Sequence, residues 1–272
     1  MAAFRKRLYA ATRRVVPNCV AQAQAVAFNM FLAAMPMLLI IMGVASLSPH
    51  LSEGFQEIMS RLGAVMPPGA RTITLRFVLA HSTYPWRWIF LGSGGTLLAG
   101  MQMMRLVIDG FQMLHGDAAP HGSWSKQFRA VLLLVATIAP WLVAANLLVF
   151  GRSARTWLIQ NSGLSLLFIV LLAAIYIFAA LFLAMLALAV IYRVGRPSTS
   201  YAEPVLPGAA LATLLWWVVS AALGFYMRHV PYSLVYGGLA VAIGVMLWMQ
   251  LTSTILFLGA AYNIEVAAGR AG

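Results

Sequence analysis

Residues 236–265 read YGGLAVAIGVMLWMQLTSTILFLGAAYNIE, an apolar run long enough to cross a bilayer as one α-helix. Four polar side chains interrupt this run near its middle, those of Gln250, Thr252, Ser253 and Thr254. A polar group left unsatisfied in hydrocarbon costs several kcal/mol. These side chains therefore either form hydrogen bonds to a neighbouring helix or line a hydrated path, and the sequence is compatible with both.

The composition of the whole chain is that of an integral membrane protein. Of the 272 residues, 62% are hydrophobic and only 9% are charged, whereas a soluble globular domain carries about 25% charged residues. Apolar stretches of roughly 20 residues recur along the chain, without the alternating pattern of a transmembrane β-barrel. The predicted fold class is therefore all-α, a polytopic membrane protein in contact with the lipid bilayer.

Six transmembrane helices are predicted, within a single integral membrane domain that covers residues 1–272. The predicted spans cover about 20–47, 88–108, 130–150, 164–192, 207–226 and 237–262. The polar interval 48–87 contains stretches of helical periodicity, such as SEGFQEIMSRL at 52–62. It is predicted to form short amphipathic helices along the membrane surface.

The distribution of lysine and arginine predicts the orientation of these spans. An even number of spans places both termini on one side, and more of the 18 basic residues fall on that side than on the other. Because loops rich in Lys and Arg remain in the cytoplasm, both termini are predicted to be cytoplasmic. Anionic lipid headgroups at that face account for the formal net charge of +12, so no nucleic-acid partner is expected.

The sequence contains few residues suited to hydrolytic chemistry, with six acidic residues and five histidines. Asp109, His115, Asp117 and His121 cluster between the second and third spans, but they do not follow a recognised zinc spacing. Cys19 is the only cysteine, which excludes an internal disulfide. We therefore predict no catalytic residue, no metal and no cofactor. A metal or nuclease site in this histidine-containing loop remains the alternative.

Polar residues of the second span fall on one helix face. Gln102, Arg105 and Asp109 follow at i, i+3 and i+7, and Arg105 can pair with Asp109 four residues on. One interpretation places them at the cytoplasmic end of the span, where Arg105 reaches the headgroups. The other interpretation places these side chains at the charged rim of a central cavity.

The sixth span has a comparable polar face. Gln250, Ser253 and Thr254 share it, and Asn263 and Glu265 follow at its cytoplasmic end. If this face lines a hydrated path, Asn29 of the first span is expected to lie opposite. This face either bonds one helix to another through small and polar residues or lines a hydrated path, and one sequence does not separate the two.

The chain resembles the YihY/BrkB family of bacterial inner-membrane proteins. The resemblance rests on LPGAALATLLWWVVSAALGFYM, on SLVYG, on LWMQLTSTILFLGAAYNIE and on the first span, AQAQAVAFNMFLAAMPMLLI, and covers 20–265 in the same order. The motif residues, expected to be structural, are Pro36, Pro207, Gly208, Tyr236, Gly237, Trp248 and Gly259. Asn29 and Gln250 depart from the family pattern, since each stands where an aromatic residue is usual.

The resemblance implies a six-helix protein of the bacterial inner membrane, in a family without a settled molecular activity. Some members carry a ribonuclease BN label regarded as a misassignment, and others a virulence-factor name. The first hypothesis for this chain is a transporter or export component for a small or envelope-related solute. The alternatives are a membrane scaffold for envelope partners or lipids and, third, a membrane-bound ribonuclease.

Overall fold

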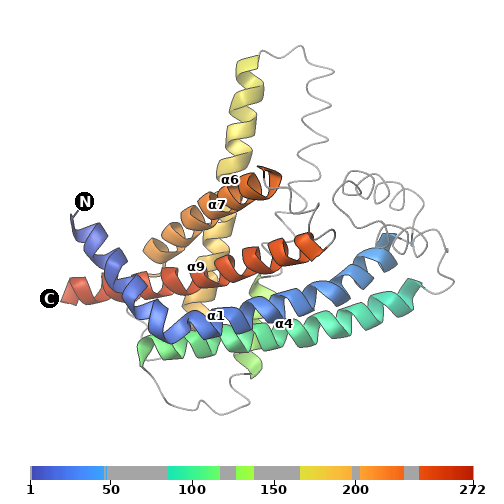
Figure 1. Ribbon diagram of the computed structural model, residues 1–272, viewed down its shortest axis with the longest axis horizontal. Coiled ribbons are helices and arrows are strands. Elements are labelled where there is room, and N and C mark those ends of the chain that lie inside the picture. The colour runs from blue at the N-terminus through green and yellow to red at the C-terminus, as the bar shows by residue number, and fades with distance from the viewer. Residues whose placement is uncertain are drawn as a thin grey trace. The chain divides into compact units, whose positions relative to one another are not determined.

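The computed structural model describes residues 2–45, 47, 85–116, 127–137, 166–197, 203–229 and 239–271. Within these ranges the regular structure is helical, without strands. The long helices are α1 (Ala2–Ala45), α4 (Pro85–His115), α6 (Leu166–Gly195), α7 (Leu206–His229) and α9 (Leu239–Ala271), coloured along the chain in Figure 1. A shorter apolar helix covers Gln127–Thr137. The all-α prediction is confirmed for this part of the chain.

Four helices of the described ranges are long and apolar enough to cross a bilayer. The four segments are Cys19–Ile41 in α1, Phe178–Gly195 in α6, Leu206–Met227 in α7 and Ala242–Gly269 in α9. They coincide with the first, fourth, fifth and sixth predicted spans. The chain is thus a membrane protein with several apolar helices.

The second and third predicted spans have a different outcome. Residues 88–108 are helical in α4. However, α4 is not among the four helices that are long and apolar enough to cross a bilayer. Its glycines and the side chains of Gln102 and Arg105 lower the mean hydropathy of this segment. The third span is described only as far as Thr137. The amphipathic helices predicted for 48–87 lie outside the described residues, except at 85–87, where α4 begins. The number six therefore stays a prediction.

The helices belong to two compact units, which are treated separately. Unit 1 comprises residues 1–20, 107–217 and 254–272, and unit 2 comprises 21–106 and 218–253. Several helices contribute one part to each unit, since the division falls within α1, α4, α7 and α9.

In unit 2, α1 and α4 pack with their backbones close together (Figure 1). A Cβ atom added at Gly92 would lie 2.7 Å from the carbonyl oxygen of Pro36, and one added at Gly43 would lie 2.7 Å from Ile89. The helices are antiparallel, because the later residue of α1 faces the earlier residue of α4. Small residues permit this close approach in membranes. Gln22 adds a polar link by donating to the carbonyl of Leu106 at 2.7 Å.

In unit 1, the core forms around the Phe111 side chain of α4. Its ring lies 5.8 Å from that of Tyr192 in α6 and 5.9 Å from that of Phe257 in α9 (centroid distances), and the latter pair meets edge to face. These are favourable separations for aromatic pairs. Gly195 leaves room for the Phe111 ring, which would lie 2.8 Å from an added Cβ atom. Phe111 thus joins α4, α6 and α9 within this unit.

The outer face of α6 is suited to lipid. Leu171, Ile175, Phe178, Phe182 and Leu186 are all exposed and follow one another at intervals of three or four residues. Such spacing places them on one side of a helix. A stripe of large apolar side chains would be unfavourable in water but matches the hydrocarbon of a bilayer.

Candidate functional site

A small recess in unit 1 gathers the ionisable side chains of several elements. It encloses about 20 Å³, which is room for about one water molecule. His115, Tyr192, Arg196, Glu203 and Asn263 contribute its polar lining. The recess therefore lies where α4 ends, α6 ends, α7 begins and α9 passes.

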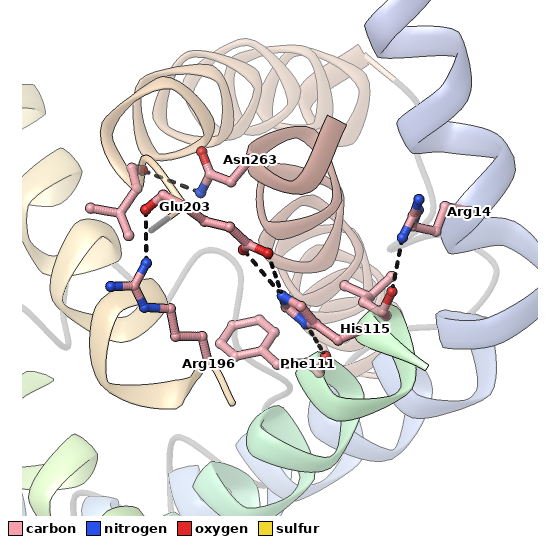
Figure 2. Close-up of polar contacts among 8 residues, drawn as sticks. Arg14, Phe111, His115, Arg196, Glu203 and Asn263 are labelled. Carbon is pink, nitrogen blue, oxygen red and sulfur yellow. Dashed lines mark hydrogen bonds and ion pairs between the residues drawn. The ribbon is translucent and has the colours of Figure 1, made fainter. Parts of the chain in front are cut away.

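His115 is the last residue of α4 and contacts oxygen atoms through both ring nitrogens. Nδ1 lies 2.7 Å from the main-chain carbonyl oxygen of Phe111, and Nε2 lies 3.1 and 3.2 Å from the two carboxylate oxygens of Glu203. Figure 2 shows the ring between these acceptors. The two side chains are only 10% and 18% exposed. Gly116, with φ of +73°, ends α4 directly after His115 and donates to the carbonyl of Met113.

Arg196 holds the main chain of Glu203 in place. It directly follows α6 and is 6% exposed, and its Nη1 donates to the main-chain carbonyl of Glu203 at 2.7 Å (Figure 2). A guanidinium is always charged and requires acceptors when it is buried. The contact therefore orders the residue whose carboxylate meets His115.

Asn263 of α9 caps the first turn of α7. Its Oδ1 accepts the N–H of Gly208 at 2.6 Å, and its Nδ2 donates to the carbonyl of Val205 at 3.3 Å. The Val205 carbonyl also accepts the N–H of Ala209, which is the first helical bond of α7. The first N–H groups of a helix lack partners within it, and a side-chain oxygen of the preceding residue usually satisfies one of them. Here a side chain from another helix takes that role.

Two glycines permit α7 and α9 to approach this closely. A Cβ atom at Gly208 would lie 2.1 Å from the carbonyl oxygen of Gly259, and one at Gly259 would lie 2.3 Å from the Tyr192 hydroxyl. That hydroxyl donates to the carbonyl of Leu256 in α9 at 2.9 Å. Ala212 is also fully buried beside Gly259. Any larger residue at either glycine would separate the helices.

Arg14 of α1 joins the same unit through two contacts. Nη2 forms an ion pair with Glu265 of α9 at 2.9 Å, and Nη1 donates to the Leu114 carbonyl of α4 at 3.1 Å. That carbonyl belongs to the last turn of α4, where acceptors lack partners within the helix and a positive charge is favourable. Arg14 therefore ties α1 to α4 and α9.

Of the residues predicted from sequence, Asn263, Glu265, Gly208 and Gly259 come together in unit 1. Asp109 also belongs to unit 1, whereas Gln102 and Arg105 belong to unit 2. The predicted pairing of Arg105 with Asp109 stays a prediction. Tyr236 and Gly237 lie outside the described residues.

The polar face of α9 contains buried and satisfied groups in unit 2. Ser253 is 1% exposed, donates to the Met249 carbonyl at 2.9 Å and contacts the sulfur of Met30 at 3.7 Å. Trp248 donates to the Ser220 hydroxyl at 3.0 Å. Asn29, which was expected opposite this face, donates to the Ala25 carbonyl of its own helix. At Ser253 the contacts favour helix packing, while Gln250 and Thr254 are partly exposed.

Sequence reasoning did not single out Arg14, Tyr192, Arg196 or Glu203 as members of a site. The sequence does offer one signal for Glu203. It is an acidic residue just before the helix that starts near Pro207 and Gly208, and a negative charge is favourable at a helix N-terminus. The sequence singled out His115 for the alternative metal or nuclease site, not for a contact with Glu203. Within the described ranges, no group of three or more His, Cys, Asp or Glu residues could hold a metal ion. Asp117 and His121 lie outside those ranges.

The native cysteine offers a simple test of the packing in unit 1. Cys19 is fully buried, with its sulfur 3.7 Å from the Gly110 carbonyl. We expect no reaction with a hydrophilic thiol reagent in native membranes and complete reaction after denaturation, because the reagent cannot reach a buried thiol. A Cys19→Ser variant with cysteine at the exposed position Arg13 is the control and should react in the native state. Labelling of native Cys19 would contradict the packing of α1 on α4.

The long apolar helices and the polar groups at their ends define a polytopic α-helical membrane protein. Residues 14–271 match the family described as Virulence factor BrkB. The match covers most of the chain, so the chain belongs to this family, which is the YihY/BrkB family that the sequence resembles.

Two relatives show how far the likeness extends. Over 135 residues the chain is 30% identical to the ribonuclease-like protein YfkH of Bacillus subtilis, across 49% of each chain. Over 84 residues it is 32% identical to a UPF0761 membrane protein of Alteromonas mediterranea, across 30% of this chain and 29% of that one. The chain thus matches half or less of the length of these relatives. No solved structure matches the chain.

Proposed function

We propose that the chain is a six-span transporter or export component of the bacterial inner membrane, with both termini in the cytoplasm. Its substrate would be a small or envelope-related solute. The six spans include α4, whose 31 residues are enough to cross a bilayer. They also include the apolar helix Gln127–Thr137 as the described part of the third span.

The observation that carries this proposal is the gathering of charged side chains in unit 1. Arg14 pairs with Glu265, His115 pairs with Glu203, and Arg196 holds the Glu203 backbone. These ionisable side chains at the helix ends pair with one another across helices instead of each facing the headgroups alone, as expected for the closed end of a solute pathway. The start of α7 beside the recess is also typical of transporters, which use helix N-termini near their sites.

The predicted topology is consistent with this grouping. Residues 1–20, the end of α4, the end of α6 and the end of α9 are all assigned to the cytoplasmic side by the positive-inside rule, and unit 1 contains them together. We interpret these contacts as a closed cytoplasmic end. A recess of about 20 Å³ admits no solute, so passage would require the helix ends to separate.

Solute profiles of whole cells test the proposal. Cells that lack the protein, cells that contain it and cells that overproduce it would be compared by mass spectrometry of the cells and of the medium. We expect at least one solute whose ratio between medium and cells follows the amount of protein by about twofold or more, since export lowers the internal level. An unchanged ratio across a broad panel would favour the scaffold hypothesis, and crosslinking to a stoichiometric partner would then be the next measurement.

Cysteine accessibility tests whether water reaches the polar face of α9. Single cysteines would replace Gln250, Ser253, Thr254 and, as a control, Leu251, in a Cys19→Ser background. We expect a small hydrophilic thiol reagent to label positions 250 and 254 in oriented vesicles, because a solute path is hydrated. Position 253 should be protected, because Ser253 is 1% exposed and contacts Met30. Protection at 250 and 254 as well would mean that this face only joins helices.

We also propose that the chain has no enzymatic activity. The ribonuclease-like name belongs to YfkH, and His115, one residue of the alternative nuclease site, contacts Glu203. Purified protein incubated with RNA provides the test. RNA cleavage that disappears when His115, Asp117 and His121 are replaced would contradict the proposal, whereas cleavage that survives would indicate a contaminant.

A further inference from the structure

We infer that His115 and Glu203 form a proton-binding site, at which one proton holds the end of α4 to the segment before α7. The inference depends on the contacts of these residues in unit 1, and it applies whether or not the protein moves a solute. Its ligand is the proton itself, taken from water that reaches the recess.

The hydrogen-bond chemistry of the ring requires the proton. A neutral imidazole has one N–H donor and one lone pair, but both nitrogens of His115 face oxygen acceptors, at 2.7 Å for Phe111 and 3.1 Å for Glu203. In the neutral ring one lone pair would therefore face an oxygen and repel it. With one added proton both contacts are attractive.

The proton balance involves the pair rather than one residue. Without the added proton, a neutral imidazole and a carboxylate carry a net charge of −1. With it the net charge is zero, and the proton is on Nε2 of His115, which donates it in a hydrogen bond to the carboxylate of Glu203. Both residues therefore contribute to one proton site. When the proton leaves, the contact between α4 and Glu203 loses its attraction.

The other charged groups nearby are already engaged. Arg196 donates to the main-chain carbonyl of Glu203, and Arg14 is paired with Glu265 while it contacts the Leu114 carbonyl. The Tyr192 hydroxyl donates a hydrogen bond to the Leu256 carbonyl. Among the described residues, Glu203 is the carboxylate that pairs with His115. Burial disfavours a charged ring, whereas the opposite charge of Glu203 in direct contact at 3.1 Å favours it.

His229 makes the same main-chain contact in different surroundings. Its Nδ1 contacts the carbonyl of Phe225, four residues earlier, at 2.9 Å, just as Nδ1 of His115 contacts that of Phe111. Among the described residues, however, His229 forms no ion pair with a carboxylate, its side chain is exposed, and its ring lies 3.9 Å from that of Phe225 (centroid distance). The two histidines therefore share one contact and differ in burial, in ring contact and in the presence of Glu203.

Nuclear magnetic resonance of ring-labelled histidine in the full chain, reconstituted in lipid nanodiscs, tests the inference. A His115→Gln variant assigns the His115 signals, and the ¹⁵N shifts report which ring nitrogens carry protons. We expect Nδ1 and Nε2 of His115 both to carry protons at neutral pH, because each faces an oxygen acceptor. A Glu203→Gln variant should reduce the proton affinity of His115 about tenfold or more, because an amide has no negative charge.

Glu265→Gln is the matched control for Glu203→Gln. It removes a carboxylate of the same unit that contacts Arg14 instead of His115, and should leave the His115 titration unchanged within about 0.3 pH units. A His115 ring in the native protein with one unprotonated nitrogen at neutral pH would overturn the inference, and this observation requires no folded variant. A normal His115 titration in Glu203→Gln would overturn it as well.

Discussion

Replacing Gly208 by alanine is expected to destabilise the protein by about 3 kcal/mol, near the upper end for overpacking of a well-packed contact. The added methyl group would lie 2.1 Å from the Gly259 carbonyl oxygen and 2.6 Å from the Asn263 side chain. Because the first of these atoms belongs to a helix backbone, it cannot move aside as a flexible side chain would. The start of α7 must therefore shift away from α9, which also breaks the cap that Asn263 provides.

The measurement is thermal unfolding of the purified full chain in one fixed detergent. A loss of about 3 kcal/mol corresponds to a midpoint lower by roughly 6–12 °C in a protein of this size. Gly224→Ala in the same helix is the control, since an added Cβ atom there meets nothing within 4 Å. Alanine is the better helix former by about 1 kcal/mol, so this control should be neutral or stabilising. Equal behaviour of the two variants would contradict the close contact of α7 with α9.

Much of the helical organisation could be predicted from the sequence. Runs of apolar residues are a strong signal because every span must bury about 20 residues in hydrocarbon. Four of the six predicted spans coincide with apolar helices of the structure. The boundaries were less predictable. The apolar segment of α1 starts at Cys19, next to the predicted span start at 20, but the helix itself already begins at Ala2, because it continues through residues whose basic side chains suit the cytoplasmic surface.

The candidate site was less predictable, because its contacts join residues that are far apart in the chain. Asn263 and Glu265 were recognised as polar residues at the end of the last span, but their partners Gly208 and Arg14 lie 55 and 251 residues away. Nothing in the sequence near Glu203 indicates that its carboxylate meets His115. A short-range pattern reports helix faces and helix ends, whereas the pairing of one helix end with another depends on the tertiary packing.

Replacing Asn263 by leucine is expected to destabilise the protein by about 2–3 kcal/mol. Leucine has the same branching at Cγ as asparagine but no polar atom, so the Gly208 N–H loses the acceptor that now lies at 2.6 Å. This N–H belongs to the first turn of α7, has no partner in its own helix and is buried. An orphaned buried donor costs about 1–3 kcal/mol, and loss of a cap costs about 0.5–2 kcal/mol in proteins generally. The Val205 carbonyl also loses its hydrogen bond from Asn263, but it still accepts the N–H of Ala209, so the cost there is smaller.

Asn29→Leu is the matched control for this prediction. Asn29 is also an asparagine of an apolar helix, but its amide donates to Ala25 of its own helix, so no group on another helix loses a partner. Its replacement should change stability by less than about 0.5 kcal/mol. If Asn263→Leu were as stable as Asn29→Leu in the same unfolding experiment, the N–H of Gly208 would have another acceptor. In that case the role of Asn263 would be that of a packing residue, and the start of α7 would not depend on α9 for its cap.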